Sequence, residues 1–403
     1  MSRCTGRALR ILAFSAVDLS LPQGHALHLR GILDALAERG HAVRLVTPRP
    51  VGTRPRTRFA RTEIPVLRLG VLGPWSFEKW GGLVLFFAAL FRRPDLLYVR
   101  HDLYTLAPGI VARCLRIPMA VEVNASIPDE AALWGRRSVR RIATFCERFT
   151  LRRGDRILVL AREQAAAIAR RVRVPEDRFR TVEIGTRLPV PIDVAEVRRA
   201  ETVPEDRFLV GFAGNLSPVQ GVGRLLDAAA LWDRDRTELW VIGTGTEESA
   251  LRARADRAPA RIRLFGGVDR DEADRLLAAC QVLVAPYDRA AYGRISAGGA
   301  LSSKILTYLA ADRPILVADL PAYSWIEEIG AGERVDADRP EVLAERIDAW
   351  RDRWVEAGRP LNGWPWRAPG PGRRFVEEGR TWEAAAEKTE SVLREMLPER
   401  GGP

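Results

Sequence analysis

Glycine-rich segments that follow apolar runs are the residues whose type and spacing first suggest chemistry in this sequence. One is Gly211-Phe-Ala-Gly-Asn-Leu-Ser-Pro-Val-Gln-Gly-Val-Gly223, and another is Val241-Ile-Gly-Thr-Gly245. Each lies between an expected strand and an expected helix, where glycine allows close backbone approach and a helix start offers free amides to an anion. Glycines in such turns also serve packing alone. The pattern favours the two explanations about equally.

Lys304 stands out among the cations. The chain carries 63 lysines and arginines and a net charge of +11, yet its only lysines are Lys79, Lys304 and Lys388. A helix lysine is usually solvated, but a lysine kept in so arginine-rich a chain favours a specific role. Arg294 lies in the loop before it and is a weaker candidate, since chance placement of an arginine is about as plausible here.

Polar residues also lie where the expected strands of the first half end. Glu122 and Asn124 close one such strand, at the sheet edge where α/β proteins bind ligands. A helix cap explains Asn124 nearly as well. Gly24 is either a turn residue or faces a phosphate or sugar. His25 and His28 follow it, and no carboxylate lies near them in the sequence to form an acid–base pair.

The elements that must position these residues alternate between strands and helices. In the first half, apolar runs predict strands over residues 9–15, 42–47, 96–99, 119–123 and 156–160, and a helix over residues 27–39. In the second half they predict strands over 208–212, 238–242, 262–265, 282–285 and 314–317, with helices over 222–231, 247–254, 271–279 and 304–310. This order implies parallel sheets.

The expected organisation is therefore two doubly wound α/β domains. The polar, proline-containing segment 190–206 is the predicted linker, which gives domains over residues 1–190 and 206–370. A Pro/Gly-rich stretch precedes a last helix, predicted over 373–397. Ligands are expected in the loops at the carboxyl ends of the strands.

Composition excludes several classes of protein. The 47% apolar content is that of a globular chain, and the longest apolar run, residues 83–91, is too short to span a bilayer. Four scattered cysteines fit a reducing compartment, and no Cys/His spacing suggests a metal site. No nucleic-acid module is present.

One stretch suits an anionic membrane surface. Residues 136–153 place arginines on one side of a helix and apolar residues on the other, and Trp75 and Trp80 lead into the apolar run. A solvated arginine-rich face over a packed helix explains the pattern at least as well.

Taken in order, the second-half loops resemble family 4 glycosyltransferases of the GT-B fold. The resemblance rests on the two glycine-rich loops, Phe265-Gly-Gly267, Val284-Ala-Pro-Tyr287 and the segment from Ser302 to Val317. It extends to Glu122-Val-Asn-Ala125 and to a terminal helix that returns to the first domain. It implies two facing Rossmann-like domains, with a nucleotide-sugar donor in the second and an acceptor in the first.

The same resemblance assigns roles to residues. It places the donor at Gly24, Gly214, Gly243, Gly245 and Ser302, and it makes Lys304, Glu122 and Asn124 the catalytic candidates. The family's arginine and lysine that hold the diphosphate correspond here to Asn215 and Gln220, and its two glutamates to Gly299 and Thr307. Arg294 would then supply charge that the substitutions remove.

The implied activity is transfer of a sugar, with retention, from a UDP- or GDP-linked donor to a glycan or lipid-linked acceptor in cell-surface polysaccharide biosynthesis. The resemblance implies no cofactor and no essential metal. The expected location is the cytoplasm or the cytoplasmic face of the plasma membrane. The alternative is a catalytically silent GT-B protein that binds a glycan or partners an active transferase.

Overall fold

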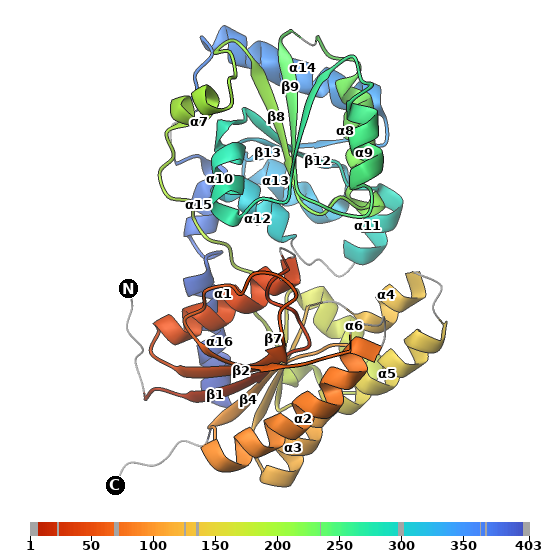
Figure 1. The fold of residues 1–403 in the computed structure, drawn as a ribbon, viewed down its shortest axis with the longest axis vertical. Helices are drawn as coiled ribbons and strands as arrows, with labels where there is room; N and C mark the ends of the chain where they lie inside the picture. The colour runs from red at the N-terminus through yellow and green to blue at the C-terminus, as the bar shows by residue number, and fades with distance from the viewer. Residues whose placement is uncertain are drawn as a thin grey trace. The chain divides into compact units, whose positions relative to one another are not determined.

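The computed structural model describes residues 7–21, 24–67, 72–124, 126–133, 137–233, 235–296, 302–362, 364–366 and 369–397, with only the backbone for 130, 132, 133 and 293–296. These residues form two compact units (Figure 1). One unit contains the chain up to Gly185 together with the segment from Trp382 onward, and the other begins at Thr186 and ends at Thr381. Each unit is a parallel sheet covered by helices, as the sequence predicts.

The first unit contains a seven-stranded sheet in the order β3-β2-β1-β4-β5-β6-β7. Its strands are β1 (Arg10–Phe14), β2 (Ala42–Pro48), β3 (Ala60–Ile64), β4 (Leu96–Arg100), β5 (Met119–Val123), β6 (Arg156–Val159) and β7 (Phe179–Thr181). Its helices are α1 (Gly24–Glu38), α2 (Leu72–Arg92), α3 (Ala107–Leu115), α4 (Ile127–Leu133), α5 (Arg137–Leu151), α6 (Arg162–Val172) and α16 (Trp382–Glu395).

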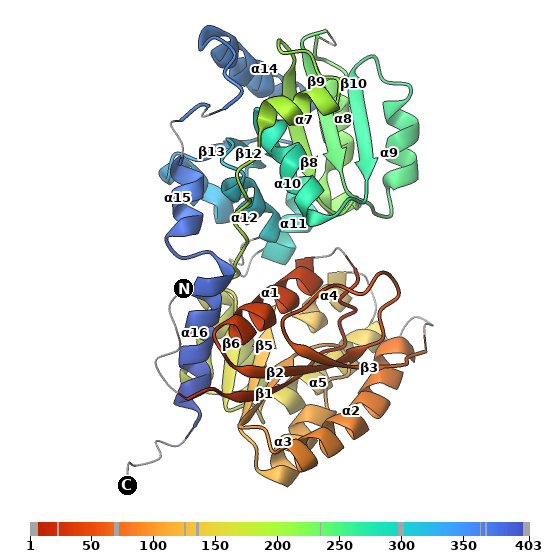
Figure 2. The ribbon, with the colours of Figure 1, turned by 60° about the vertical axis from the view of Figure 1, so that its left-hand side comes forward.

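Two apolar layers stabilise this sheet from opposite faces. On one face, Leu29, Ile32, Leu33 and Leu36 of α1 pack with residues of α16, and both helices lie beside the strands (Figure 2). On the other face, α2, α3 and α6 bury residues such as Phe77 against the sheet. The apolar residues whose 3.6-residue spacing predicts α1 are the residues that α1 buries against the sheet.

The second unit contains a six-stranded sheet in the order β10-β9-β8-β11-β12-β13. Its strands are β8 (Phe208–Ala213), β9 (Thr237–Ile242), β10 (Arg261–Gly266), β11 (Val282–Ala285), β12 (Ile315–Ala318) and β13 (Gly332–Val335). Its helices are α7 (Val194–Ala200), α8 (Val222–Ala229), α9 (Glu248–Ala255), α10 (Arg270–Ala279), α11 (Arg289–Ser296), α12 (Ser303–Ala310), α13 (Ser324–Glu328), α14 (Pro340–Glu356) and α15 (Pro371–Glu377).

Two boundaries differ from the sequence prediction. The predicted linker 190–206 contains α7, which begins at the side-chain cap of Asp193 and packs on α10, so the segment is part of the second unit. The single helix predicted over 373–397 is two helices, because the chain turns at Gly379 and forms a parallel bridge between Thr381 and Thr186. Its second half, α16, packs on α1.

The longest helix is α2, with 21 residues. It contains the apolar run 83–91, for which the sequence analysis predicts no secondary structure. Within the described ranges, no helix combines the length and the apolar character needed to cross a bilayer.

Candidate active site

In the second unit, the carboxyl ends of β8 and β11 meet where the strand order reverses, which is the position at which doubly wound sheets bind ligands. The loop after β8 runs from Gly214 to Gly221 and leads into α8. The loop after β11 leads into α11, and the two loops are joined by a hydrogen bond of 3.0 Å from the Asp288 amide to the Val219 carbonyl. The candidate residues of the second unit gather around these loops.

Lys304 lies in the first turn of α12 with its ammonium above the rings of Phe212 and Tyr287, at 3.9 and 5.1 Å from their centroids. Its Nζ donates a hydrogen bond of 2.5 Å to Oε1 of Gln220. In the described part of the chain no carboxylate forms an ion pair with it. Burial lowers the pKa of Lys304 well below the ordinary lysine value. The ammonium therefore has a neutral oxygen and two ring faces as partners, and an anion would stabilise its charged form.

Tyrosines form the aromatic side of this site. Tyr287 stacks on Tyr292 with 3.9 Å between ring centroids, and the Tyr292 and Tyr323 hydroxyl oxygens are 2.8 Å apart. The Tyr287 hydroxyl donates to Oγ of Ser302 at 2.9 Å. The sequence analysis assigns these rings no role. Tyr287 lies two residues after the end of the buried strand β11, a position that indicates a pocket residue, but its stacking with Tyr323 depends on tertiary structure.

The glycines of the two loops serve close contact between backbones. A β-carbon at Gly221, where φ is +69°, would lie 1.8 Å from the Pro286 carbonyl oxygen. One at Gly243 would lie 1.9 Å from the Gly214 oxygen, and one at Gly245 2.2 Å from the oxygen of Leu216. Packing of loop against loop thus explains these glycines without a ligand.

Gly214 differs, because a β-carbon there would meet a side chain. It would lie 2.6 Å from Cε of Lys304 and 2.9 Å from Nζ. Asn215 follows it with an exposed side chain, and Gln220 holds the ammonium. The two positions at which the resemblance expects cations therefore carry one exposed amide and one amide that binds the remaining cation.

Ser302 and Thr307 belong to α12 and have internal partners. Oγ of Ser302 accepts the backbone N–H of Lys304 at 3.3 Å and so caps the helix. The Thr307 hydroxyl donates to the Ser303 carbonyl oxygen at 3.0 Å. A helix start with a capping serine presents its positive end at the site.

Arginines around the site are engaged or not described. Arg224 pairs with Asp288 at 2.7 Å and with Asp338 at 3.2 Å, so its charge is already compensated. Arg294 lies in α11 with its side chain outside the described residues, and Gly299 is likewise outside them. Lys304 is thus the described cation that contacts both loops without an acidic partner.

In the first unit, Glu122 is a buried, paired carboxylate. Its Oε1 lies 2.7 Å from Nε2 of His28, and its Oε2 accepts the Tyr98 hydroxyl. It is 3% exposed. Burial opposes its ionisation, but His28, Arg100 and Tyr98 outweigh that effect and lower the pKa of Glu122 to about 2. This pairing ties α1 to β5.

The sequence analysis finds no carboxylate near His28 because the partner lies on another element. Glu122 is far away in the chain, and only the register of β4 and β5, which places Arg100 opposite Glu122, brings it under α1. No local pattern carries that information.

Several polar atoms at the end of β4 and β5 have no partner among the described residues. They include both ring nitrogens of the buried His101, Nε of Arg100 and Oδ1 of Asn124. Burial lowers the pKa of His101 to about 4, so its ring is neutral at pH 7. Asn124 is not the described cap of α4, since Ser126 accepts the Asp129 amide at 3.3 Å. Buried polar groups normally have partners, so this edge can receive a hydroxyl-bearing ligand.

Gly24 is exposed at the first residue of α1, next to His25. Burial and Arg100 lower the pKa of His25, while Asp102 opposes that shift. Gly24 and His25 thus belong to the edge where the strand order of the first sheet reverses, between β1 and β4. Among the described side chains, no group of three or more His, Cys, Asp or Glu residues could hold a metal ion.

Two family models match the chain in succession. Residues 23–185 match the glycosyl transferase 4-like domain, and residues 207–352 match the glycosyl transferases group 1 domain. Together the matches cover about three quarters of the sequence. A search of curated proteins by sequence found no match.

Solved structures share the fold of the whole chain. HepE of Anabaena in complex with UDP is 14% identical, with a TM-score of 0.69 over 96% of this chain and 100% of that one. Sucrose-phosphate synthase of Thermosynechococcus elongatus is 18% identical, with a TM-score of 0.72 over 96% and 98%. WaaG, a glycosyltransferase involved in lipopolysaccharide biosynthesis, is 18% identical, with a TM-score of 0.68 over 97% and 100%. With both domain models matched in order on this fold, the chain belongs to the family 4 type of glycosyltransferases with the GT-B fold.

Proposed function

We propose that the protein transfers a hexose-type sugar, with retention at the anomeric carbon, from a UDP- or GDP-linked donor. The observation that carries this proposal is Lys304, an ammonium held by Gln220 and two aromatic rings at the reversal point of the second sheet. A nucleoside diphosphate is an anion, and it would supply the negative charge that Lys304 lacks as a partner. HepE, which shares the fold, is described in complexes with UDP and with UDP-glucose.

The chemistry asks for positive charge where the leaving group forms. As the bond between the sugar and the diphosphate breaks, negative charge gathers on the leaving oxygen, and a preorganised cation there lowers the barrier. Lys304 supplies that cation, and the capped start of α12 adds its positive end. The ring of Tyr287, fixed by its bond to Ser302, keeps the ammonium in place. The proposal needs no cofactor beyond the donor substrate and no essential metal.

The acceptor is proposed to be a glycan or a lipid-linked glycan bound by the first unit. The unpartnered atoms of His101, Arg100 and Asn124 offer donors and acceptors to sugar hydroxyls. Because His101 stays neutral at pH 7, one of its ring nitrogens donates and the other accepts. In this proposal the pathway is polysaccharide biosynthesis, in the cytoplasm or at the cytoplasmic face of the plasma membrane.

A silent GT-B protein is the competing function, and the loss of charge at Asn215 and Gln220 favours it. The two are separated by ligand-dependent thermal stabilisation with UDP, GDP and their sugars. A nucleotide at 100 times its dissociation constant adds about 2.7 kcal/mol of stability. We expect one nucleotide to stabilise the protein and the Lys304→Met variant to lose most of that effect. If no nucleotide stabilises the protein, the donor site is not functional.

Transfer and its stereochemistry need a second measurement. Donors of the stabilising nucleotide are screened with mixed glycan and lipid-linked acceptors, and the product linkage is assigned by NMR. Retention predicts the same anomeric configuration in the product as in the donor sugar. An inverted product would contradict the proposed mechanism while leaving the donor site intact.

A further inference from the structure

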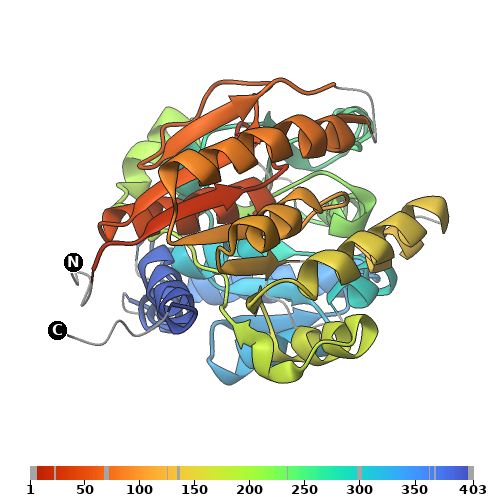
Figure 3. The ribbon, with the colours of Figure 1, turned by 90° about the horizontal axis from the view of Figure 1, so that it is seen from below.

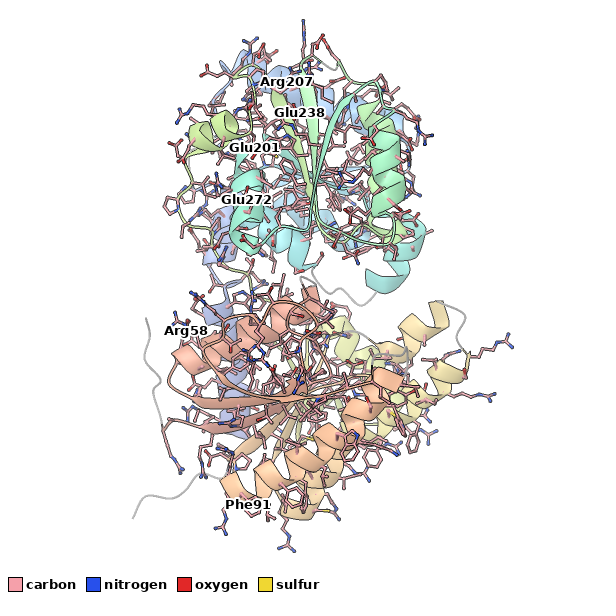
Figure 4. The ribbon with its side chains drawn as sticks, in the orientation of Figure 1. Arg58, Phe91, Glu201, Arg207, Glu238 and Glu272 are labelled. Carbon is pink, nitrogen blue, oxygen red and sulfur yellow. The ribbon has the colours of Figure 1, made fainter. Side chains whose placement is uncertain are left out.

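The outward side of α2 is apolar although it faces solvent. The helix buries Phe77, Leu85 and Ala89 against the sheet, as a surface helix should. Its opposite side also carries large apolar residues, all of them exposed: Leu72, Trp75, Trp80, Leu83, Phe87, Leu90 and Phe91. Phe91 is 78% exposed and Trp80 62%. Figure 4 shows Phe91 at the outer end of the helix.

The two neighbouring helices continue this surface. α3 packs on α2 and on α5, and the three run side by side on one face of the sheet (Figure 3). Ile110 on α3 and Ile142 and Phe145 on α5 are exposed, Phe145 by 62%. We call these ten residues, seven on α2 and three on α3 and α5, the apolar face. Every exposed large aromatic side chain of the described residues lies on it.

The alternative explanation for α5 is a solvated arginine-rich face above an apolar stripe that packs in the core. The exposure of the apolar residues on α5 does not fit this explanation. The residues that α5 buries are Ala143, Cys146, Glu147, Thr150 and Leu151. Phe145 and Ile142 of the predicted apolar stripe are therefore not core residues. Packing does not account for them, so they need another explanation.

The exposed charges on the three helices of the apolar face are of one sign. Exposed arginines border it on all three helices and at their ends: Arg92, Arg93, Arg113, Arg116, Arg137, Arg140, Arg141, Arg148, Arg152 and Arg153. The carboxylates that belong to these helices are Glu78, which accepts the Leu106 amide at 2.7 Å, and Glu147, which pairs with Arg171 at 2.7 Å and is fully buried. Neither Glu78 nor Glu147 balances the exposed arginines.

A groove at the ends of α2 and α3 also combines apolar side chains with arginines. It has a volume of about 780 Å³ and a partly apolar wall that includes Leu90 and Leu115. Arg93 and Arg116 line it from the left-handed turns that end α2 and α3, with φ of 45° and 52°. Neither forms an ion pair within the described part of the chain. Asp95 also lines the groove, but its carboxylate pairs with Arg10 at 3.1 Å, which leaves Arg93 and Arg116 for the phosphate of a lipid headgroup.

We propose that the apolar face is the surface by which the first unit docks on a lipid bilayer containing anionic phospholipids. Aromatic and aliphatic side chains enter the boundary between headgroups and acyl chains, while the bordering arginines contact lipid phosphates. An apolar face that bound a neutral partner protein would not require so many exposed arginines on its border. This inference extends the acceptor side of the proposed function, and it is tested without donor or acceptor, so either can fail alone.

The test is partition of the whole protein onto vesicles in a flotation assay. Vesicles of phosphatidylcholine alone are compared with vesicles containing about one third phosphatidylglycerol. We expect binding to the anionic vesicles, and its loss as salt is raised to about 0.5 M, where screening shortens the reach of surface charge. Absence of binding to anionic vesicles at low salt would overturn the proposal.

Two variants separate the apolar and the electrostatic parts. Trp80→Ser, Phe87→Ser and Phe91→Ser together remove exposed groups and are expected to weaken partition more than tenfold. Arg137→Gln with Arg141→Gln should weaken binding to anionic vesicles alone, by about fivefold for each cation.

The matched controls lie in the second unit. Leu231→Ser with Val355→Ser removes exposed apolar groups of the second unit, and Arg236→Gln removes an exposed cation. Equal losses in the controls would contradict the assignment of the face. Sedimentation measures whether a second copy of the chain covers this face instead. If the parent protein self-associates and the triple variant does not, a second copy binds there and the membrane proposal is overturned.

Discussion

The carboxyl edges of the two sheets treat charge in opposite ways. In the first unit, the Glu122 carboxylate has His28 and Tyr98 as partners and lies in register with Arg100. In the second unit, the Lys304 ammonium has only the neutral Gln220 and two aromatic rings. Burying a charge is costly unless it is paired. The paired Glu122 carboxylate stabilises the fold. The Lys304 ammonium has no anionic partner, so an anionic ligand can pair with it.

The most direct attempt to break this contrast is Lys304→Met, which keeps the length of the side chain and removes its charge. If the ammonium stabilises the leaving diphosphate, turnover should fall about 10²- to 10³-fold, as for removal of one preorganised donor. Stability to urea should stay the same or rise, because no unpaired charge remains to be buried.

Lys388→Met is the matched control, since that lysine is exposed and pairs with Glu183 at 2.7 Å. Its turnover should be that of the parent. Unchanged turnover in Lys304→Met would place the donor diphosphate elsewhere.

The compensated charge predicts a pH dependence of stability. The pKa of Glu122 is lowered to about 2 in the folded protein, so its contribution is present above the unfolded value near 4.5 and is lost as pH falls from there toward 2. Glu122→Gln should cost about 3 kcal/mol of unfolding free energy at pH 7 and flatten that acid loss. Urea unfolding at a series of pH values measures both.

If Glu122→Gln loses as much unfolding free energy at low pH as the parent does, other carboxylates cause that loss. Glu395→Gln is a useful comparison, because Glu395 pairs with Arg156 and Arg180 at the surface and should contribute little.

The packing of loops in the second unit predicts a loss of unfolding free energy similar to that expected for Glu122→Gln. Gly221→Ala places a β-carbon against the Pro286 carbonyl in a left-handed turn and should cost about 3 kcal/mol, from strain and overpacking together. Gly330→Ala has nearly the same φ, +71°, but meets nothing within 4 Å, so about 1 kcal/mol is expected. Equal losses in urea unfolding would show that the contact between the loops is not stabilising.

The smallest effect separates the position of Lys304 from its charge. Gly214→Ala should push Cε of Lys304 aside and weaken nucleotide binding on the order of tenfold, as for partial loss of a charge-assisted hydrogen bond. Gly379→Ala meets nothing within 4 Å and serves as the control. Calorimetric titration with UDP or GDP gives the affinities. Undiminished affinity in Gly214→Ala would show that the ammonium tolerates displacement.

Local patterns predict the strands that form both sheet centres, because buried parallel strands are continuous apolar runs. β11 matches its prediction residue for residue, and α1 buries the predicted stripe. The rarity of lysine in the chain and the family resemblance together single out Lys304. The pairing of His28 with Glu122 and the stacking of Tyr287 on Tyr323 were not predicted, because they are contacts between residues that are distant in the sequence.

Elements with polar or mixed patterns were also missed. β13 has a half-buried sequence, Gly332-Glu-Arg-Val335, without an apolar run. α7 lies among prolines and charges, yet it folds because Asp193 caps it through two amides and α10 covers its apolar side. Capping and packing together outweigh a composition typical of a linker.

The bridge between Thr186 and Thr381 joins the two points at which the chain enters and leaves the second unit. The second unit begins and ends at that bridge, where the Thr186 amide also donates to the Arg380 carbonyl at 2.8 Å. The described residues of the second unit therefore form an insertion into the first unit, and the two ends of this insertion meet. We therefore expect that the proposed donor half can be exchanged as a cassette through the two junctions before Thr186 and after Thr381, while the proposed acceptor half keeps its own sheet and helices.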